Sequence, residues 1–242
     1  MTSTPTRPTP ARRLDEAGLA AAVDALGARD AVLARIAARH GVPPLWSRDP
    51  GFATLCLIVL EQQVSLAAGR DALRRLEAAA GGVEPARVAD LGEGGLRDAG
   101  LTRQKARYLA GLANAMLDGS LRIDDLGELD DEAVRATLMA LPGIGRWTAD
   151  VYLMFALGRP DVWPAADLAL AASAQHVLGL ATRPTPAELD ALAGRWRPWR
   201  SAAARLLWHS YLSGDRPRRP ARATRPLARA ARASDPRETV SR

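Results

Sequence analysis

Residues 141–150 read Leu-Pro-Gly-Ile-Gly-Arg-Trp-Thr-Ala-Asp, and residues 161–167 read Asp-Val-Trp-Pro-Ala-Ala-Asp. Gly143 and Gly145 predict a turn whose backbone amides can approach a phosphate closely, because glycine has no Cβ and tolerates positive φ. The apolar stretch that follows predicts a helix whose free N–H groups and positive end face the same point. Asp167 adds one carboxylate beyond that helix. A phosphate-binding turn beside a carboxylate indicates chemistry on nucleic acid.

The composition is that of a folded protein, with 242 residues of which 48% are hydrophobic and 25% are charged. The longest strongly apolar run, residues 55–60, is too short to span a bilayer. The N-terminus lacks the apolar segment of a signal peptide. We therefore expect a cytoplasmic, nucleoid-associated protein that makes no contact with a membrane.

Cysteine and histidine usage excludes several classes of metal site. Cys56 is the single cysteine, so the chain has no intramolecular disulfide and no multi-cysteine zinc or iron–sulfur site. It lies inside an apolar run, which indicates a buried and inert thiol. The three histidines, His40, His176 and His209, lack the spacing of metal ligands. We expect no metal centre and no cofactor.

The positive charge is concentrated at the C-terminus. The whole chain carries +6, but residues 216–242 hold nine arginines against Asp235 and Glu238, so the other 215 residues carry −1. We interpret 214–242 as a disordered Arg/Pro-rich tail, 1–13 as a flexible leader and 14–213 as one folded domain. The tail could attract phosphates in a salt-sensitive way, and the alternative is a solvated terminus without a role.

The periodicity of apolar residues predicts an all-α fold of eight to ten short helices, with no β-strand alternation. Helix starts are indicated at Ser65, Thr102, Asp130 and Thr185, the last in a capping box with proline at the first helical position. The expected segments include a helical pattern over 14–39, a helix over 52–60 and a second helix that begins after Ser65 and runs to residue 80. A Gly-rich connection is expected over 92–100 and a last helix at about 199–213.

These features resemble the HhH-GPD superfamily of helix–hairpin–helix DNA glycosylases, and within it the alkylbase (3-methyladenine) DNA glycosylase II branch. The resemblance covers about residues 20–213 and is carried, in order, by residues 60–65, 100–109, 141–150, 160–168 and 195–208. It implies a two-lobed helical fold. It also implies that the N-terminal β-rich domain of some relatives is lacking, since the chain has no room for it before Leu14.

The resemblance implies roles for individual residues. Asp167 stands at the position of the catalytic aspartate, and Trp147 and Trp208 at positions that line the base pocket. The DNA-binding hairpin comprises Gly143, Ile144, Gly145 and Thr148, and a monovalent cation could bind the carbonyls of Leu141 and Gly143. The alternatives are that Asp167 only caps a helix, that the tryptophans are core residues, and that the hairpin is an ordinary corner between two helices.

The implied chemistry agrees with the residue types. Cleavage of an N-glycosidic bond develops positive charge on the sugar, which one ionised carboxylate can stabilise while it orients water. An alkylated base is cationic and leaves readily, so aromatic faces suffice to hold it. Relatives that also nick DNA use a lysine as nucleophile where this chain has Trp147. Lys105, the only lysine, lies in an earlier helix. The sequence therefore predicts monofunctional release of alkylated purines.

The predicted partner is double-stranded DNA with damaged bases, and we expect the protein to act as a monomer. The target base must be flipped out of the duplex, and a side chain must fill the gap. The resemblance makes Gln63 the wedge, although some relatives carry an apolar residue there, and a helix-capping amide is the alternative. Ala166, Asp150 and Val151 also depart from relatives, which leaves the substrate range open. Competing hypotheses are a glycosylase for deaminated bases and a non-catalytic damage-sensing module.

Overall fold

The computed structural model describes residues 13–215, so the predicted leader and basic tail lie almost entirely outside the described residues. The described part is helical and contains no strand, as expected for an all-α fold. None of its helices is long and apolar enough to cross a membrane. The α-helices are α1 (Glu16–Gly27), α2 (Ala31–His40), α3 (Phe52–Glu61), α4 (Leu66–Ala80), α5 (Pro85–Asp98), α6 (Arg103–Leu117), α7 (Asp131–Met139), α8 (Arg146–Phe155), α9 (Leu168–Val177), α10 (Pro186–Ala193) and α11 (Arg200–Leu212).

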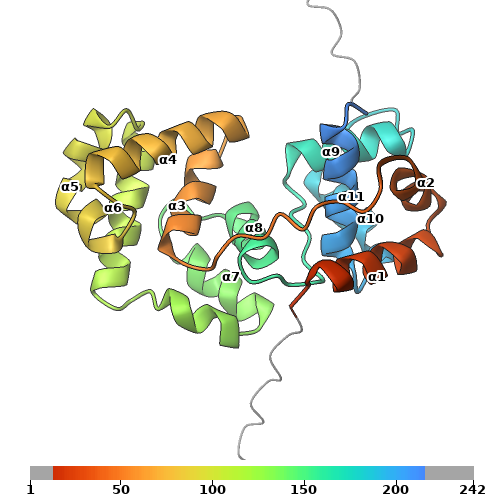
Figure 1. The fold of residues 1–242 in the computed structure, drawn as a ribbon, viewed down its shortest axis with the longest axis horizontal. Coiled ribbons are helices and arrows are strands. Elements are labelled where there is room, and N and C mark those ends of the chain that lie inside the picture. Colours follow the sequence, from red (N-terminus) through yellow and green to blue (C-terminus); the bar gives the residue numbers. More distant parts are fainter. Residues whose placement is uncertain (1–12, 216–242) are drawn as a thin grey trace, which may run out of the picture.

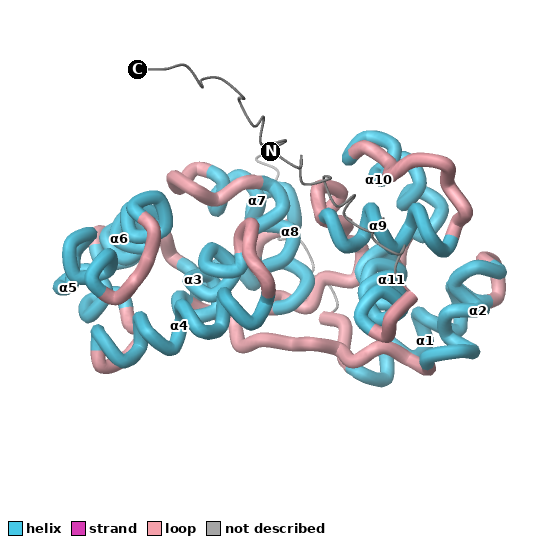
Figure 2. Tube along the Cα trace, turned by 90° about the horizontal axis from the view of Figure 1, so that it is seen from above, coloured by secondary structure: helices cyan, strands magenta, loops and turns pink. Residues whose placement is uncertain are grey.

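The helices form two lobes (Figure 1). One lobe contains α3 to α6, and the other contains α1, α2 and α9 to α11, with α8 between them. Helices α1 and α2 pack against α11, so the two ends of the described chain share a lobe. The loop over residues 41–51 crosses from that lobe to α3, and the tube in Figure 2 shows the same separation from above.

The predicted helix starts are confirmed by side-chain hydrogen bonds. The hydroxyls of Ser65, Thr102 and Thr185 each accept a hydrogen bond from a backbone N–H three residues later, and so does the carboxylate of Asp130. At Thr185 the reciprocal bond from its backbone N–H to Glu188 completes the capping box. These contacts are local, which explains why sequence alone predicts them.

Two helix boundaries differ from the prediction. The pattern over 14–39 is two helices, because Asp30 caps α2 through the N–H groups of Val32 and Leu33. The segment expected to be a Gly-rich connection is helical in α5 up to Asp98, with non-helical dihedral angles only at Gly92. Since α5 packs extensively on α6, tertiary packing outweighs the low helix propensity of glycine. The described residues therefore hold eleven α-helices instead of eight to ten.

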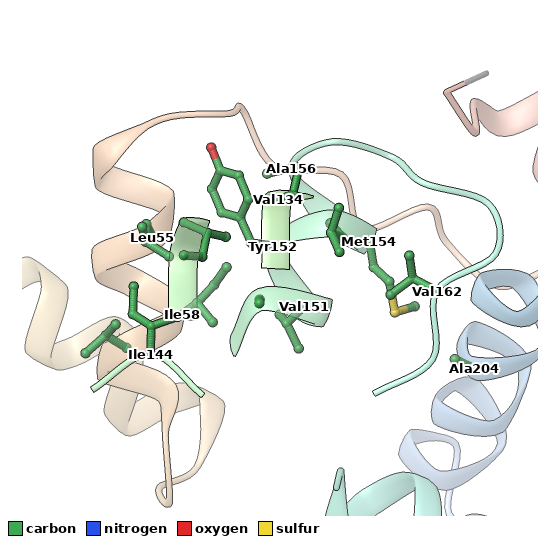
Figure 3. Close-up of a cluster of buried hydrophobic side chains, with 14 of the residues drawn as sticks. Leu55, Ile58, Val134, Ile144, Val151, Tyr152, Met154, Ala156, Val162 and Ala204 are labelled. Atoms are coloured by element: carbon green, nitrogen blue, oxygen red, sulfur yellow. The ribbon is translucent and has the colours of Figure 1, made fainter. Parts of the chain in front are cut away.

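The core is continuous through α8 (Figure 3). Leu55 and Ile58 of α3 lie at one end of this cluster, and Val162 and Ala204 lie toward the other lobe. Tyr152 is fully buried between them, and its hydroxyl accepts a hydrogen bond from Gly51 N at 3.0 Å. Helix α8, which follows the hairpin, is thus held from both sides.

A buried arginine in α11 makes hydrogen bonds to the segments that join the two lobes. Arg205 of α11 is 1% exposed and donates to the carbonyls of Leu45, Ser201 and Met154 at 2.9, 3.1 and 2.8 Å. Burial lowers the pKa of this guanidinium to about 10. Its three acceptors lie in the 41–51 loop, in α11 and in α8, so the arginine sets the position of α8 against the second lobe.

Candidate active site

The hairpin joins α7 to α8 and presents the start of α8 to solvent. Its turn is closed by a hydrogen bond from Ile144 N to Leu141 O at 3.2 Å, and Gly143 has a φ of +87°. Gly145 is the N-cap of α8, where no side chain caps the helix. A Cβ added at Gly145 would meet no atom within 4 Å. The free N–H groups of the first turn, the helix dipole and this open space together suit a phosphate.

Gly143 is required for packing as well as for its backbone conformation. A Cβ at this position would lie 2.2 Å from ring atoms of Tyr108 in α6, far inside van der Waals contact. The ring of Tyr108 therefore fits directly against the turn. The positive φ of Gly143 also disfavours any residue with a Cβ. Sequence reasoning placed Tyr108 in a motif of the resemblance without assigning it this contact.

A buried ion pair joins the two helices of the hairpin. Arg135 of α7 donates from Nε to Asp150 Oδ1 of α8 at 2.6 Å, and the two side chains are 8% and 1% exposed. Burial raises the pKa of Asp150, and the hydrogen bond from Arg135 opposes that shift. Arg146 lies 3.6 Å from the other carboxylate oxygen. Asp150, noted as a departure from relatives, therefore braces the hairpin.

Asp167 lies at the start of α9 and accepts three hydrogen bonds. Its Oδ1 accepts from Leu170 N at 2.8 Å, which makes it the N-cap of α9. The same atom accepts from Trp208 Nε1 at 3.1 Å, and Oδ2 accepts from Trp147 Nε1 at 2.9 Å. The three predicted site residues thus meet at one carboxylate, although they lie on α8, α9 and α11. The helix-capping role and the indole contacts coexist.

The tryptophans are partly exposed, and aromatic packing supports one of them. Trp208 lies against Phe155 with ring centroids 5.5 Å apart and an angle of 32° between the rings. The guanidinium groups of Arg48 and Arg205 lie 5.6 and 5.1 Å from the Phe155 centroid. Trp147 follows the first residue of α8, so the first turn of that helix links the hairpin to Asp167. The hairpin turn, where we expect a phosphate to bind, is therefore linked to the Asp167 carboxylate through the first turn of α8.

The predicted wedge lies on the exposed turn between α3 and α4. Gln63 is exposed and has a φ of +59°, a left-handed conformation that is unusual for a residue with a Cβ. The amide that makes hydrogen bonds here is that of the neighbouring Gln62, which donates to Gly143 O and to Thr148 Oγ1, both at 2.9 Å. The resemblance gave the wedge to the loop over residues 62–64, with Gln63 as the best candidate, and did not predict the contacts of Gln62 with the hairpin.

The structure also shows the surroundings of the expected cation site and of Lys105. Of the carbonyls expected to bind a cation, Gly143 O accepts a hydrogen bond from Gln62 and Leu141 O accepts one from Ile144. Each oxygen retains a second lone pair, so the cation stays a prediction. Lys105 donates from Nζ to Leu60 O at 2.7 Å, and burial lowers the pKa of its ammonium group.

Comparison with known proteins gives a consistent set of relatives. The family model for HhH-GPD superfamily base excision DNA repair proteins matches residues 56–198. DNA-3-methyladenine glycosylase 2 of Escherichia coli is 34% identical over 126 residues, which are 52% of this chain and 42% of that protein. DNA-3-methyladenine glycosylase of Bacillus subtilis is 30% identical over 180 residues, 69% of this chain and 57% of that protein.

A solved structure extends the likeness to the whole fold. The 3-methyladenine DNA glycosylase of Schizosaccharomyces pombe, in complex with abasic DNA, superposes with a TM-score of 0.76 at 25% identity. The match covers 81% of this chain and 99% of that one. The chain spans less than two thirds of the length of each of the two bacterial relatives described above.

Proposed function

We propose a reaction from the premise that this chain belongs to the HhH-GPD superfamily of base excision DNA repair proteins. The reaction is hydrolysis of the N-glycosidic bond of alkylated purines, such as 3-methyladenine and 7-methylguanine, in duplex DNA. The observation that carries the proposal is the convergence of Trp147 and Trp208 on the carboxylate of Asp167. The two bacterial relatives and the solved yeast enzyme, which bear the name 3-methyladenine glycosylase, support the same substrate class.

The first step is binding of the duplex and extrusion of the damaged nucleotide. The N–H groups at the start of α8, around Gly145, would bind a backbone phosphate. Gln63, exposed on its turn, would fill the gap left in the stack. A cationic alkylated base would then lie against the electron-rich faces of Trp147 and Trp208, which favour positive charge. These contacts select a cationic base over a neutral one.

The second step is rupture of the bond between the sugar C1′ and the base nitrogen. The bonding electrons pass to the base, which leaves neutral, and positive charge develops on the sugar. The Asp167 carboxylate, oriented by two indole N–H donors and by Leu170 N, would stabilise that charge. Water then adds to C1′ and loses a proton, and an abasic strand remains. No general acid is required, because the leaving base already carries the positive charge.

The strand is expected to stay intact after base release. Strand cleavage by related enzymes requires a lysine nucleophile at the position of Trp147. Lys105, the only lysine, donates to the carbonyl of Leu60 at the end of α3. The side-chain oxygens of Asp167 accept hydrogen bonds from Trp147, Trp208 and Leu170. We propose a monofunctional enzyme that works as a monomer on DNA in the cytoplasm.

The test compares wild type with Asp167→Asn on methylated duplex DNA. Asparagine retains helix-capping ability, so α9 should form. Wild type should release 3-methyladenine or 7-methylguanine, identified chromatographically, and leave an uncut abasic strand, whereas Asp167→Asn should bind DNA without release. Asp190→Asn, which changes an exposed carboxylate on α10, is the matched control and should behave like wild type.

Three outcomes would contradict the proposal. Release of deaminated bases alone would assign the site to neutral lesions. Equal behaviour of wild type and Asp167→Asn, with no base released by either, would support a non-catalytic damage-sensing module. Cleavage of the abasic strand by purified wild type would contradict the monofunctional assignment. Each outcome is read from the same reaction by chromatography of the base and electrophoresis of the strand.

A further inference from the structure

Gln62 connects the exposed turn to the hairpin. It is the C-cap residue of α3 and comes directly before Gln63 in the chain. Its side chain is partly buried, and its amide nitrogen donates to Gly143 O and to Thr148 Oγ1, both at 2.9 Å. These acceptors are 81 and 86 residues away in sequence. One amide group therefore joins the α3–α4 turn to the α7–α8 hairpin.

The two acceptors come from residues on either side of Gly145 in the sequence, the N-cap of α8. Gly143 belongs to the turn of the hairpin, and Thr148 is the third residue of α8 and is 2% exposed. A side-chain amide offers two N–H donors on one nitrogen, which is what these two oxygens require. Glutamate would present acceptors to an accepting carbonyl, so the residue type at position 62 matters for this contact.

Helix α6 supports both segments from one face. Lys105 donates from Nζ to Leu60 O at 2.7 Å, at the end of α3, and the ring of Tyr108 packs against Gly143. Positions three apart on a helix lie on the same face, so one rigid element holds the end of α3 and the hairpin turn together. Gln63 follows directly after this supported segment and has a left-handed backbone, a conformation that costs free energy for a residue with a Cβ.

We infer that Gln62 is a positioning residue that couples phosphate binding at the hairpin to the presentation of Gln63. The inference rests on the proposed function, because it assigns the wedge role to Gln63. A phosphate bound at the start of α8 keeps the hairpin in the conformation to which the Gln62 amide is bonded. That amide in turn holds the end of α3 where the left-handed turn points Gln63 outward. Without it, the enzyme grips DNA but inserts the wedge inefficiently.

The test is a double-mutant cycle between positions 62 and 63. Gln62→Met keeps the length of the side chain and removes both donors, and Gln63→Ala removes the wedge. Base flipping is followed by stopped-flow fluorescence of 2-aminopurine placed beside the target 7-methylguanine of a duplex, a signal that reports flipping before any bond is cleaved. Affinity for an undamaged duplex is measured separately by anisotropy, and thermal unfolding monitors the fold. Gln175→Met on α9 is the matched control and should match wild type.

We expect Gln62→Met to slow flipping about tenfold, as the loss of two modest hydrogen bonds would. Affinity for the undamaged duplex should change less than about threefold, because the hairpin amides remain. Gln63→Ala should slow flipping in wild type but have almost no further effect in Gln62→Met, since coupled residues are not additive. Thr148→Val removes one acceptor while keeping the shape of the side chain, so it should slow flipping less than Gln62→Met does. It replaces Gln62→Met in the cycle if that variant is unstable.

Multiplicative effects of Gln62→Met and Gln63→Ala would overturn the inference, and so would an equal loss of flipping and duplex affinity in Gln62→Met. The proposed function can fail separately. If wild type releases no alkylated base but the cycle shows coupling, the positioning role stands and the reaction is wrong. If wild type releases the base but the effects multiply, the reaction stands and the positioning role is wrong.

Discussion

Replacement of Trp147 by phenylalanine separates two roles of this residue. Phenylalanine keeps an aromatic face for a cationic base but removes the indole N–H that donates to Asp167 Oδ2 at 2.9 Å. That bond is the one hydrogen bond that Oδ2 receives from the described residues. In Trp208→Phe, by contrast, Oδ1 still accepts from Leu170 N at 2.8 Å. The first variant should therefore disturb the carboxylate more than the second.

The size of the effect follows from the exposure of the carboxylate. A hydrogen bond to a charged group contributes about 1.5–3 kcal/mol, and Asp167 is only partly buried, so water replaces some of that loss. We take the lower figure, about 1.5 kcal/mol, which corresponds to roughly a tenfold slower bond cleavage for Trp147→Phe. Trp208→Phe should slow cleavage about threefold, because the backbone donor on Oδ1 remains.

The assay is the single-turnover rate of 7-methylguanine release from a defined duplex, with affinity for an abasic-site duplex measured in parallel. Trp163→Phe is the matched control, because the buried indole nitrogen of Trp163 has no hydrogen-bond partner among the described residues. It should lower stability without slowing release per folded molecule. An equal or larger effect in Trp208→Phe, or a loss of affinity with an unchanged rate, would refute the orienting role of Trp147.

Four further single substitutions test the hairpin and the C-terminal end of the described chain. Gly143→Ala should destabilise the fold by about 1–3 kcal/mol in urea unfolding, because it combines a positive φ with a clash. Gly145→Ala should leave stability unchanged and weaken DNA binding in anisotropy, since its methyl group enters the space left for a phosphate; equal Tm values for both variants would contradict this. Asp150→Asn removes the buried charge that faces Arg135 and leaves this arginine only its ion pair with the exposed Glu132, so it should lower Tm by roughly 6–12 °C by calorimetry. Asp150→Leu combined with Arg135→Met should recover most of that Tm. The hydrogen bond from the imidazole at the end of α2 lowers the pKa of Asp215, so this carboxylate stabilises the fold above its unfolded pKa of about 3.9 and loses that effect as pH falls further. In urea unfolding, the free energy of unfolding of Asp215→Asn should fall less steeply below about pH 4 than that of wild type. An identical pH dependence in the two proteins would count against this role of Asp215.

The helix starts were predictable because they depend on contacts within three residues. Ser65, Thr102, Asp130 and Thr185 each bond to the chain directly ahead of them, and no distant element is needed. The segment around Gly92 was mispredicted for the opposite reason. Its glycines favour a loop, but packing of α5 on α6 holds most of the segment in a helix.

The candidate site could be named from the sequence as a set of residues but not as a geometry. The sequence offered Asp167 as a single carboxylate after the hairpin helix, and the resemblance added Trp147 and Trp208 as residues of the base pocket. The structure adds that both indoles donate to the carboxylate. The contacts of Gln62 and Tyr108 with the hairpin were missed. Nothing in the sequence around a glutamine or a tyrosine shows which distant residue its side chain will contact.

The sequence by itself determined the all-α class, the hairpin with its glycines and the single carboxylate after it, since each depends on residue type and short spacing. Only the tertiary structure decided which groups meet. The indole nitrogens reach Asp167 across 20 and 41 residues, and the Gln62 amide reaches the hairpin across 81. Such contacts follow from the packing of α3, α6, α8 and α11 around a shared core, and packing depends on the whole chain at once.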